Sequence, residues 1–114
     1  MRFLMLYRPD PESPEGARPA PEHMAAMGKL VEDMTRSGAL LSTEGLLPRS
    51  ACACVERSGG KVTVREANER IAGFALVQAT SKEEAIQMAS EFLAVAGDGV
   101  SEIRQVMEFA PQPG

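Results

Sequence analysis

The residues of this chain best suited to acid–base chemistry are one imidazole and two carboxylates. His23 is the only histidine among the 114 residues, and Asp33 and Glu44 are the carboxylates that we consider as its partners. An imidazole that shares a proton with a carboxylate suits proton abstraction or the activation of water. Such a site forms only if the fold brings His23 against one of the two carboxylates.

His23 lies in the first turn of a helix that we predict over residues 21–37. An apolar stripe at about 100° per residue predicts this helix; it comprises Met27, Leu30, Val31 and Met34. His23 falls on the same stripe, where the helix dipole disfavours imidazolium and favours a neutral ring that can act as a base. The alternative is a structural histidine hydrogen-bonded to the proline-rich loop before the helix.

Asp33 lies about 80° around this helix from His23 and about three turns along it, which makes it a poor direct partner. It is more simply interpreted as an i,i+4 partner of Lys29 on the solvent-exposed face. Asp33 is therefore the second candidate for the carboxylate that orients His23.

Glu44 belongs to a strand predicted over residues 40–47. Alternation places Glu44 and Ser42 on one face and Thr43 on the other. Gly45 permits a bulge or a close approach of the backbone. We therefore expect Glu44 to be the carboxylate of a pocket, with Ser42 as a ligand-binding residue on the same face.

Arg104 lies in the last predicted strand, residues 100–109, in which Ile103 and Met107 are expected to face the core. In a dimer, an inward-facing arginine would bind a carboxylate-bearing ligand with its fork of donors. The alternative is an exposed or interfacial salt bridge.

The cysteines and methionines are interpreted as packing residues. Cys52 and Cys54 share a face of a strand, and together with one distant histidine they fall short of a four-ligand zinc site. We expect them to be small buried residues, and we expect no metal and no cofactor. Four of the seven methionines have the spacing of helix core positions: Met24, Met27, Met34 and Met88.

Composition narrows the class of protein. A chain of this length forms one domain, which we place at residues 1–110 with a loose tail at 111–114. A net charge of −4, a pI near 5.0 and the absence of tryptophan argue against nucleic-acid binding. No apolar run reaches the roughly 18 residues of a membrane span, and the first residues resemble a strand more than a signal peptide. We expect a cytoplasmic protein that binds no membrane.

Two predicted strands are apolar on both faces. In residues 1–7, Phe3, Met5 and Tyr7 alternate with Leu4 and Leu6, and residues 72–79 have the same pattern. A sheet covered by helices on one side only should alternate apolar with polar residues. We therefore expect a second copy of the chain to cover the other side, as a homodimer.

Residues 8–21 contain five of the eight prolines and read as an extended loop. Such a long loop acts either as a lid next to His23 or as a mobile polar connection. Short strands at 51–55 and 61–64 flank a Ser58-Gly59-Gly60 turn and predict a hairpin. Ser81 and Glu84 predict a capping box at the start of a second helix.

The predicted order is strand, helix, strand, hairpin, strand, helix, strand. This is a split βαβ plan of the α+β class, with an inserted β-hairpin and two helices on one face of an antiparallel sheet.

The sequence resembles the YCII-related (DGPF-type) domain family. The resemblance rests on short segments along nearly the whole chain: residues 5–7, 23–27, 40–48, 61–64, 71–74, 81–85 and 102–108. It implies a ferredoxin-like α+β fold that pairs sheet on sheet into a dimeric α/β barrel. The Asp-Gly-Pro-Phe motif is absent, since Val64 runs into Arg65-Glu66-Ala67-Asn68.

The resemblance also bears on function. Members are mostly of unknown activity, some occur beside extracytoplasmic-function sigma factors, and a His-Asp pair in a pocket has been proposed as catalytic in related proteins. One hypothesis is a dimeric enzyme of isomerase, hydrolase or dehydratase type, which acts on a small organic acid through His23. The other is a non-catalytic dimer that binds a metabolite or a regulatory partner.

Overall fold

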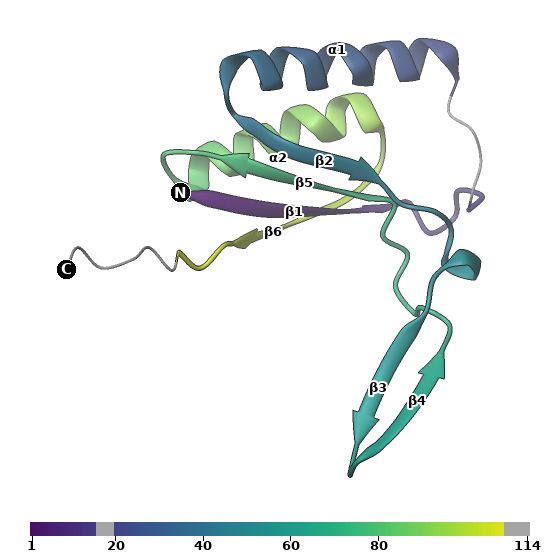
Figure 1. Cartoon of the computed structure of the whole chain (residues 1–114). Coiled ribbons are helices and arrows are strands. Elements are labelled where there is room, and N and C mark those ends of the chain that lie inside the picture. The colour runs from purple at the N-terminus through teal and green to yellow at the C-terminus, as the bar shows by residue number, and fades with distance from the viewer. Residues whose placement is uncertain (16–19, 109–114) are drawn as a thin grey trace, which may run out of the picture.

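The computed structural model describes residues 1–15 and 20–108, and it contains the predicted order of elements (Figure 1). The elements are β1 (Arg2–Pro9), α1 (Pro21–Ser37), β2 (Leu40–Gly45), η1 (Arg49–Ala51), β3 (Cys54–Ser58), β4 (Lys61–Arg65), β5 (Gly73–Gln78), α2 (Lys82–Ala96) and β6 (Gly99–Gln105).

The main sheet has the strand order β2-β5-β1-β6, with every neighbouring pair antiparallel. Both helices lie on one side of it, as Figure 1 shows. This arrangement confirms the predicted α+β, ferredoxin-like split βαβ plan, with the β3–β4 hairpin inserted between β2 and β5.

The two-faced apolar pattern of the central strands is present in the sheet. Phe3 pairs with Val77 on the side that faces the helices, and Leu4 pairs with Leu76 on the other side. We call the side away from the helices the open face. Its apolar centre consists of Leu4, Leu6, Phe74 and Leu76.

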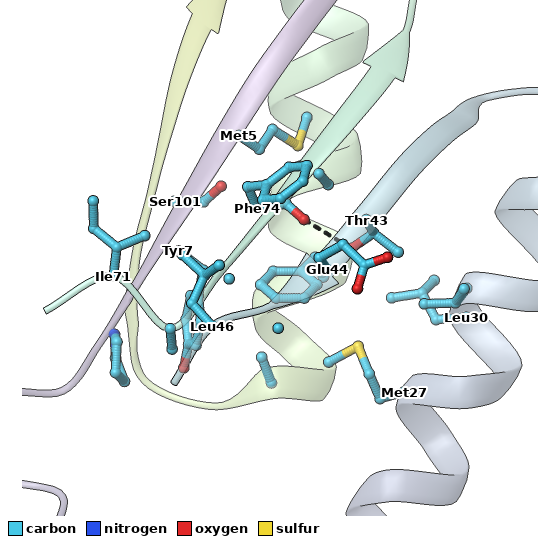
Figure 2. A pocket seen from close by; sticks show the side chains of 18 of the residues that line it. Met5, Tyr7, Met27, Leu30, Thr43, Glu44, Leu46, Ile71, Phe74 and Ser101 are labelled. Carbon is cyan, nitrogen blue, oxygen red and sulfur yellow. Dashed lines mark hydrogen bonds between the residues drawn. The ribbon is translucent and has the colours of Figure 1, made fainter. Parts of the chain in front are cut away.

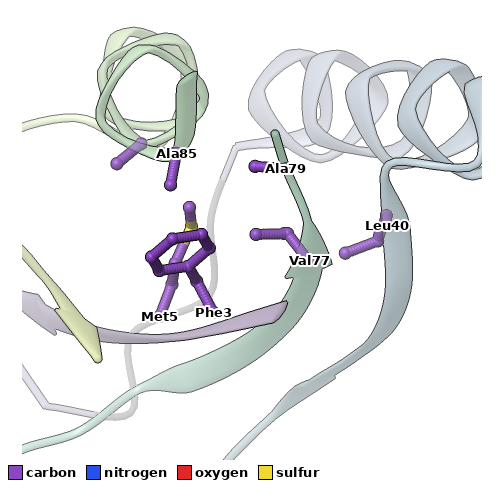
Figure 3. Close-up of a cluster of buried hydrophobic side chains, with 7 residues drawn as sticks. Phe3, Met5, Leu40, Val77, Ala79 and Ala85 are labelled. Carbon is purple, nitrogen blue, oxygen red and sulfur yellow. The ribbon is translucent and has the colours of Figure 1, made fainter. Parts of the chain in front are cut away.

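The hydrophobic core is small and lies between the sheet and α2 (Figure 3). Its fully buried side chains are Phe3 and Val77, and Ala85 and Ala89 of α2 cover them closely because they are small. The first helix contributes no buried residue. The core therefore holds α2 against the sheet much more closely than it holds α1.

The ends of the helices follow from local chemistry. Pro21 begins α1, and Gly38 ends it with a left-handed φ of 85°. The hydroxyl of Ser81 accepts a hydrogen bond from the backbone N–H of Glu84, which confirms the predicted cap. The carboxylate of Glu84 returns to the backbone N–H and hydroxyl of Thr80, one residue before the cap.

The hairpin differs from the sequence-based expectation. A short 3-10 helix occupies residues 49–51, so that β3 begins at Cys54 rather than at residue 51. The prediction that both cysteines are buried is wrong: Cys52 is exposed and Cys54 is half-buried. The reason is that the hairpin projects away from the body of the protein, where no core is available to cover it (Figure 1).

Several strand ends also differ, and β2 ends at Gly45 rather than at residue 47. β1 continues to Pro9, and β6 ends at Gln105, so the predicted strand 100–109 is too long. Met107 is exposed and does not face the core. Residue 109 and the predicted tail at 111–114 lie outside the described residues.

The edge strand β2 contains one irregularity. Leu40 pairs with Val77, but the next paired residue is Ser42, opposite Leu76, so that Leu41 is an extra residue in the strand. From this bulge onward, Thr43 pairs with Ala75 on the side that faces the helices.

Candidate functional site

A cavity of about 980 Å³ lies between α1 and the side of the sheet that faces the helices. Figure 2 shows its walls: side chains of β1, β2 and β5 on one side and of α1 on the other. Cavities that hold small molecules commonly have volumes of roughly 300–1,000 Å³. This one is at the upper end of that range.

The cavity exists because α1 stands away from the sheet. Every residue of its apolar stripe (Met27, Leu30, Val31 and Met34) lines the cavity, as does Met24, and none of them is fully buried. An amphipathic helix normally packs this stripe into the core. Here Val31 and Met34 touch the core only in part, and the stripe otherwise faces space that a ligand can occupy.

Methionine is the characteristic residue of these walls. Five of the seven methionines line the cavity: Met5, Met24, Met27, Met34 and Met88. Met5 belongs to the core, and Met34 and Met88 pack against it, as their spacing predicted. Met24 is 59% exposed, so the core interpretation is wrong for this residue. Unbranched thioether side chains adapt to ligands of different shape.

His23 lies on the wall of this cavity, in the first turn of α1, and is half-buried. Within residues 1–15 and 20–108, its ring makes no hydrogen bond to another residue, including those of the proline-rich loop that are described. Both ring nitrogens therefore remain available to a molecule bound in the cavity, as far as the described residues show.

The two candidate carboxylates lie in different places. Glu44 borders the cavity on β2, beside Thr43 (Figure 2), and its side chain is exposed. Its pairing with Phe74 puts it on the opposite side of the strand from Thr43. Asp33 lies outside the cavity and forms ion pairs with Lys29 and Arg36 on the outer side of α1. The predicted pairing of Asp33 with Lys29 is confirmed.

Ser42 and Arg104 both belong to the open face and do not line the cavity. Ser42 pairs with Leu76, and Arg104 pairs with Leu4. The guanidinium of Arg104 is exposed and lies 3.5 Å from the carboxylate of Glu102. This contact matches the salt bridge that was the alternative interpretation of Arg104.

Several polar residues of the cavity were not predicted. The hydroxyl of Thr43 donates a 2.8 Å hydrogen bond to the carbonyl of Phe74, which fixes β2 against β5. The ring of Tyr7 packs edge-on against Phe92 at 5.2 Å, and burial raises the pKa of its phenol. Ser101, the partner of Tyr7 across β1 and β6, also lines the cavity. The alternation of residues 1–7 could have identified Tyr7, since it places Tyr7 on the same side of the strand as Phe3 and Met5.

Two arginines fix residues 10–15, of which Ser13, Pro14 and Glu15 line the cavity. Arg70 donates hydrogen bonds to the carbonyls of Asp10, Ser13 and Pro14 at 2.6–3.2 Å. Arg49 holds the carboxylate of Glu15 at 2.9 Å, and its hydrogen bonds lower the pKa of that carboxyl group. Residues 10–15 are therefore attached to the body, while residues 16–19 of the predicted lid lie outside the described residues. Nothing in the sequence pattern signalled these contacts.

Among the described residues, no three His, Cys, Asp or Glu side chains gather as metal ligands would. The helices within the described ranges are too short or too polar to span a membrane.

Residues 1–110 match the sequence profile of the YCII-related domain. No curated protein matches the chain.

Proposed function

Because the chain belongs to the YCII-related domain family and its helix α1 faces an open cavity, we propose that it binds a small organic molecule between α1 and the sheet. The observation that carries this proposal is the apolar stripe of α1, which lines the cavity without a buried residue. Filling the cavity would remove that stripe from water, and burial of apolar surface contributes about 25 cal/mol per Å².

The size and chemistry of the cavity favour a ligand with a substantial apolar body. Its volume equals that of about thirty water molecules in the liquid. An organic acid of a few carbon atoms would leave most of the space to water. The groups free to orient a ligand are few: the His23 ring and the hydroxyl groups of Tyr7 and Ser101, which make no hydrogen bond within the described residues.

The binding experiment uses the chain's only tyrosine. Tyrosine emission reports on Tyr7 alone, because the chain has no tryptophan. Titration with a graded series of carboxylic acids, from acetate to dodecanoate, should change this emission and raise the melting temperature more strongly as the chain lengthens. A Gly28→Phe variant would place an aromatic ring in the cavity without adding a tryptophan and should weaken binding. A flat response to the whole series in the wild type would refute the proposal for this class of ligand.

A second candidate function is acid–base catalysis on the bound molecule, of isomerase, hydrolase or dehydratase type. It is favoured by the position of His23 on the cavity wall. His23 would act as the base, and Glu44 would be the carboxylate that borders the same cavity. Asp33 is the less favoured carboxylate, since it forms ion pairs with Lys29 and Arg36 outside the cavity. The alternative, a non-catalytic metabolite-binding or regulatory dimer, requires only the cavity.

The two functions are separated by a His23→Gln variant. In a catalytic protein, the variant should still bind the ligand but convert it at least about a hundredfold more slowly, as expected for loss of a general base. In a binding module, wild type and variant should both leave the ligand unchanged. Glu44→Gln, with Glu32→Gln on the outer side of α1 as its control, tests the carboxylate in the same assay.

We also propose that the protein is a cytoplasmic homodimer that joins through its open faces. The four apolar side chains at the centre of this face are bordered by charged residues, among them Arg8, Glu102 and Arg104. An apolar centre with a polar rim is the usual composition of a protein interface. Arg104 and Ser42 would then lie at the interface, where a ligand carboxylate could also meet the arginine. Sedimentation velocity at micromolar concentration tests the dimer.

A further inference from the structure

The β3–β4 hairpin, residues 54–65, is an arm that projects from the body of the protein (Figure 1). Cys54, at its base, is half-buried, and its other strand residues are exposed. A two-stranded hairpin is at best marginally stable in water when nothing packs on it. The arm therefore needs a surface that the described part of its own chain does not offer.

One side of the arm is mainly apolar and consists of three valines and Arg57. Val55 pairs with Val64, and Arg57 pairs with Val62, so that the three valines share one side. All three are exposed: Val55 by 66%, Val62 by 58% and Val64 by 68%. The other side carries polar residues, among them Glu56 opposite Thr63. This pattern is typical of a strand pair with one side covered and one side in water.

The direction of the arm indicates where a surface that covers its valines would lie. Figure 1 shows the arm extending to the side of the sheet opposite the helices, which is the side of the open face. Five residues per strand give it a reach of roughly 17 Å, whereas two sheets packed face to face are about 10 Å apart. If two copies pack through their open faces, each arm is long enough to pass the plane of the partner's sheet and to lie against the partner.

The charges of the arm agree with this placement. The arm contains one acidic residue, Glu56, and three basic residues, Arg57, Lys61 and Arg65, so its formal charge is +2. Since the whole chain has a net charge of −4, the rest of the chain carries −6. A basic arm would be attracted to the acidic body of a second copy.

We propose that each arm grips a second copy of this chain with its valine side, so that the dimer is held by two reciprocal arms as well as by the open faces. This proposal rests on the dimer proposed above. Because a two-fold dimer contains both arms, each substitution acts twice.

The experiment compares Val64→Lys with Thr63→Lys in sedimentation velocity over a dilution series. The two substitutions add the same charge to adjacent residues of one strand, but on opposite sides of the arm. Val64→Lys should raise the dimer dissociation constant by roughly a hundredfold, about tenfold for each arm, while Thr63→Lys should change it less than about threefold. Circular dichroism of each variant verifies that the body remains folded.

A Leu76→Lys variant on the open face separates failure of the arm from failure of the dimer. If Leu76→Lys dissociates the dimer while Val64→Lys does not, the arm proposal is overturned and the face-to-face dimer stands. Equal effects of Val64→Lys and Thr63→Lys would also overturn the role of the valine side. A monomeric wild type at micromolar concentration would overturn both proposals.

Discussion

Replacing Gly99 by alanine should destabilise the protein through a single methyl group. An added Cβ would lie 2.6 Å from the carbonyl oxygen of Arg8 and 2.9 Å from Cε1 of Tyr7. The first contact is with backbone that is paired with β6 at this point, since Pro9 lies opposite Gly99. Neither the oxygen nor the ring can give way without opening the β1–β6 pair or disturbing the wall of the cavity.

Overpacking of this kind costs about 1–3 kcal/mol. In a domain of roughly 100 residues, each kcal/mol lowers the melting temperature by about 4–6 °C. We therefore expect Gly99→Ala to melt about 5–15 °C below the wild type in a thermal scan followed by circular dichroism. The near-ultraviolet signal of Tyr7, the chain's only tyrosine, should change as well.

Gly28→Ala is the matched control. Gly28 lies inside α1, and an added Cβ there would meet no atom within 4 Å. Alanine is favoured over glycine in a helix by about 0.5–1 kcal/mol, so this variant should melt about 2–6 °C higher than the wild type. A Gly99→Ala variant that melts within about 1 °C of the wild type would show that β1 and β6 are not packed as described.

Three further perturbations test other contacts. Ser81→Ala removes the cap of α2 and should cost about 1 kcal/mol in urea unfolding, whereas Ser90→Ala, within the same helix, should be neutral or slightly stabilising. Phe3→Ala empties the centre of the core and should cost about 3–5 kcal/mol; a loss below about 1 kcal/mol would contradict its burial. Hydrogen bonds from Arg49 hold the pKa of Glu15 below its ordinary 4.5, so this contact stabilises the fold fully above pH 4.5 and less as the pH falls through the lowered pKa. The difference in melting temperature between wild type and Glu15→Gln should therefore shrink between pH 6 and pH 3, and a constant difference would argue against the contact.

The order of elements could be predicted because local signals mark their ends. Pro21 and Gly38 delimit α1 at the predicted residues, and Gly59 and Gly60 form the hairpin turn with positive φ angles. The apolar alternation of β1 indicated apolar side chains on both faces of the sheet, which the register confirms; that a second copy covers the open face stays a prediction. These signals depend on a few neighbouring residues, so they can be interpreted without the fold.

The cavity could not be predicted for a physical reason. An apolar stripe shows that a helix avoids water, but it does not show how far the helix stands from the sheet. The contacts of Arg70 also escaped prediction, because they join irregular segments some 60 residues apart. Cys52 lies in the segment that leads into the arm, and its exposure depends on where the tertiary structure directs that segment.

The extra residue Leu41 decides which side chain β2 turns toward the ligand. With the bulge, the inward position opposite Ala75 belongs to Thr43, and Glu44 falls opposite Phe74. In an uninterrupted ladder, every later residue of the strand would change sides, and Glu44 would enter the cavity opposite Gly73. Pairing of the same residues without the bulge would thus add a negative charge to the wall that faces His23, and a chain otherwise folded in the same way would select a different class of molecule.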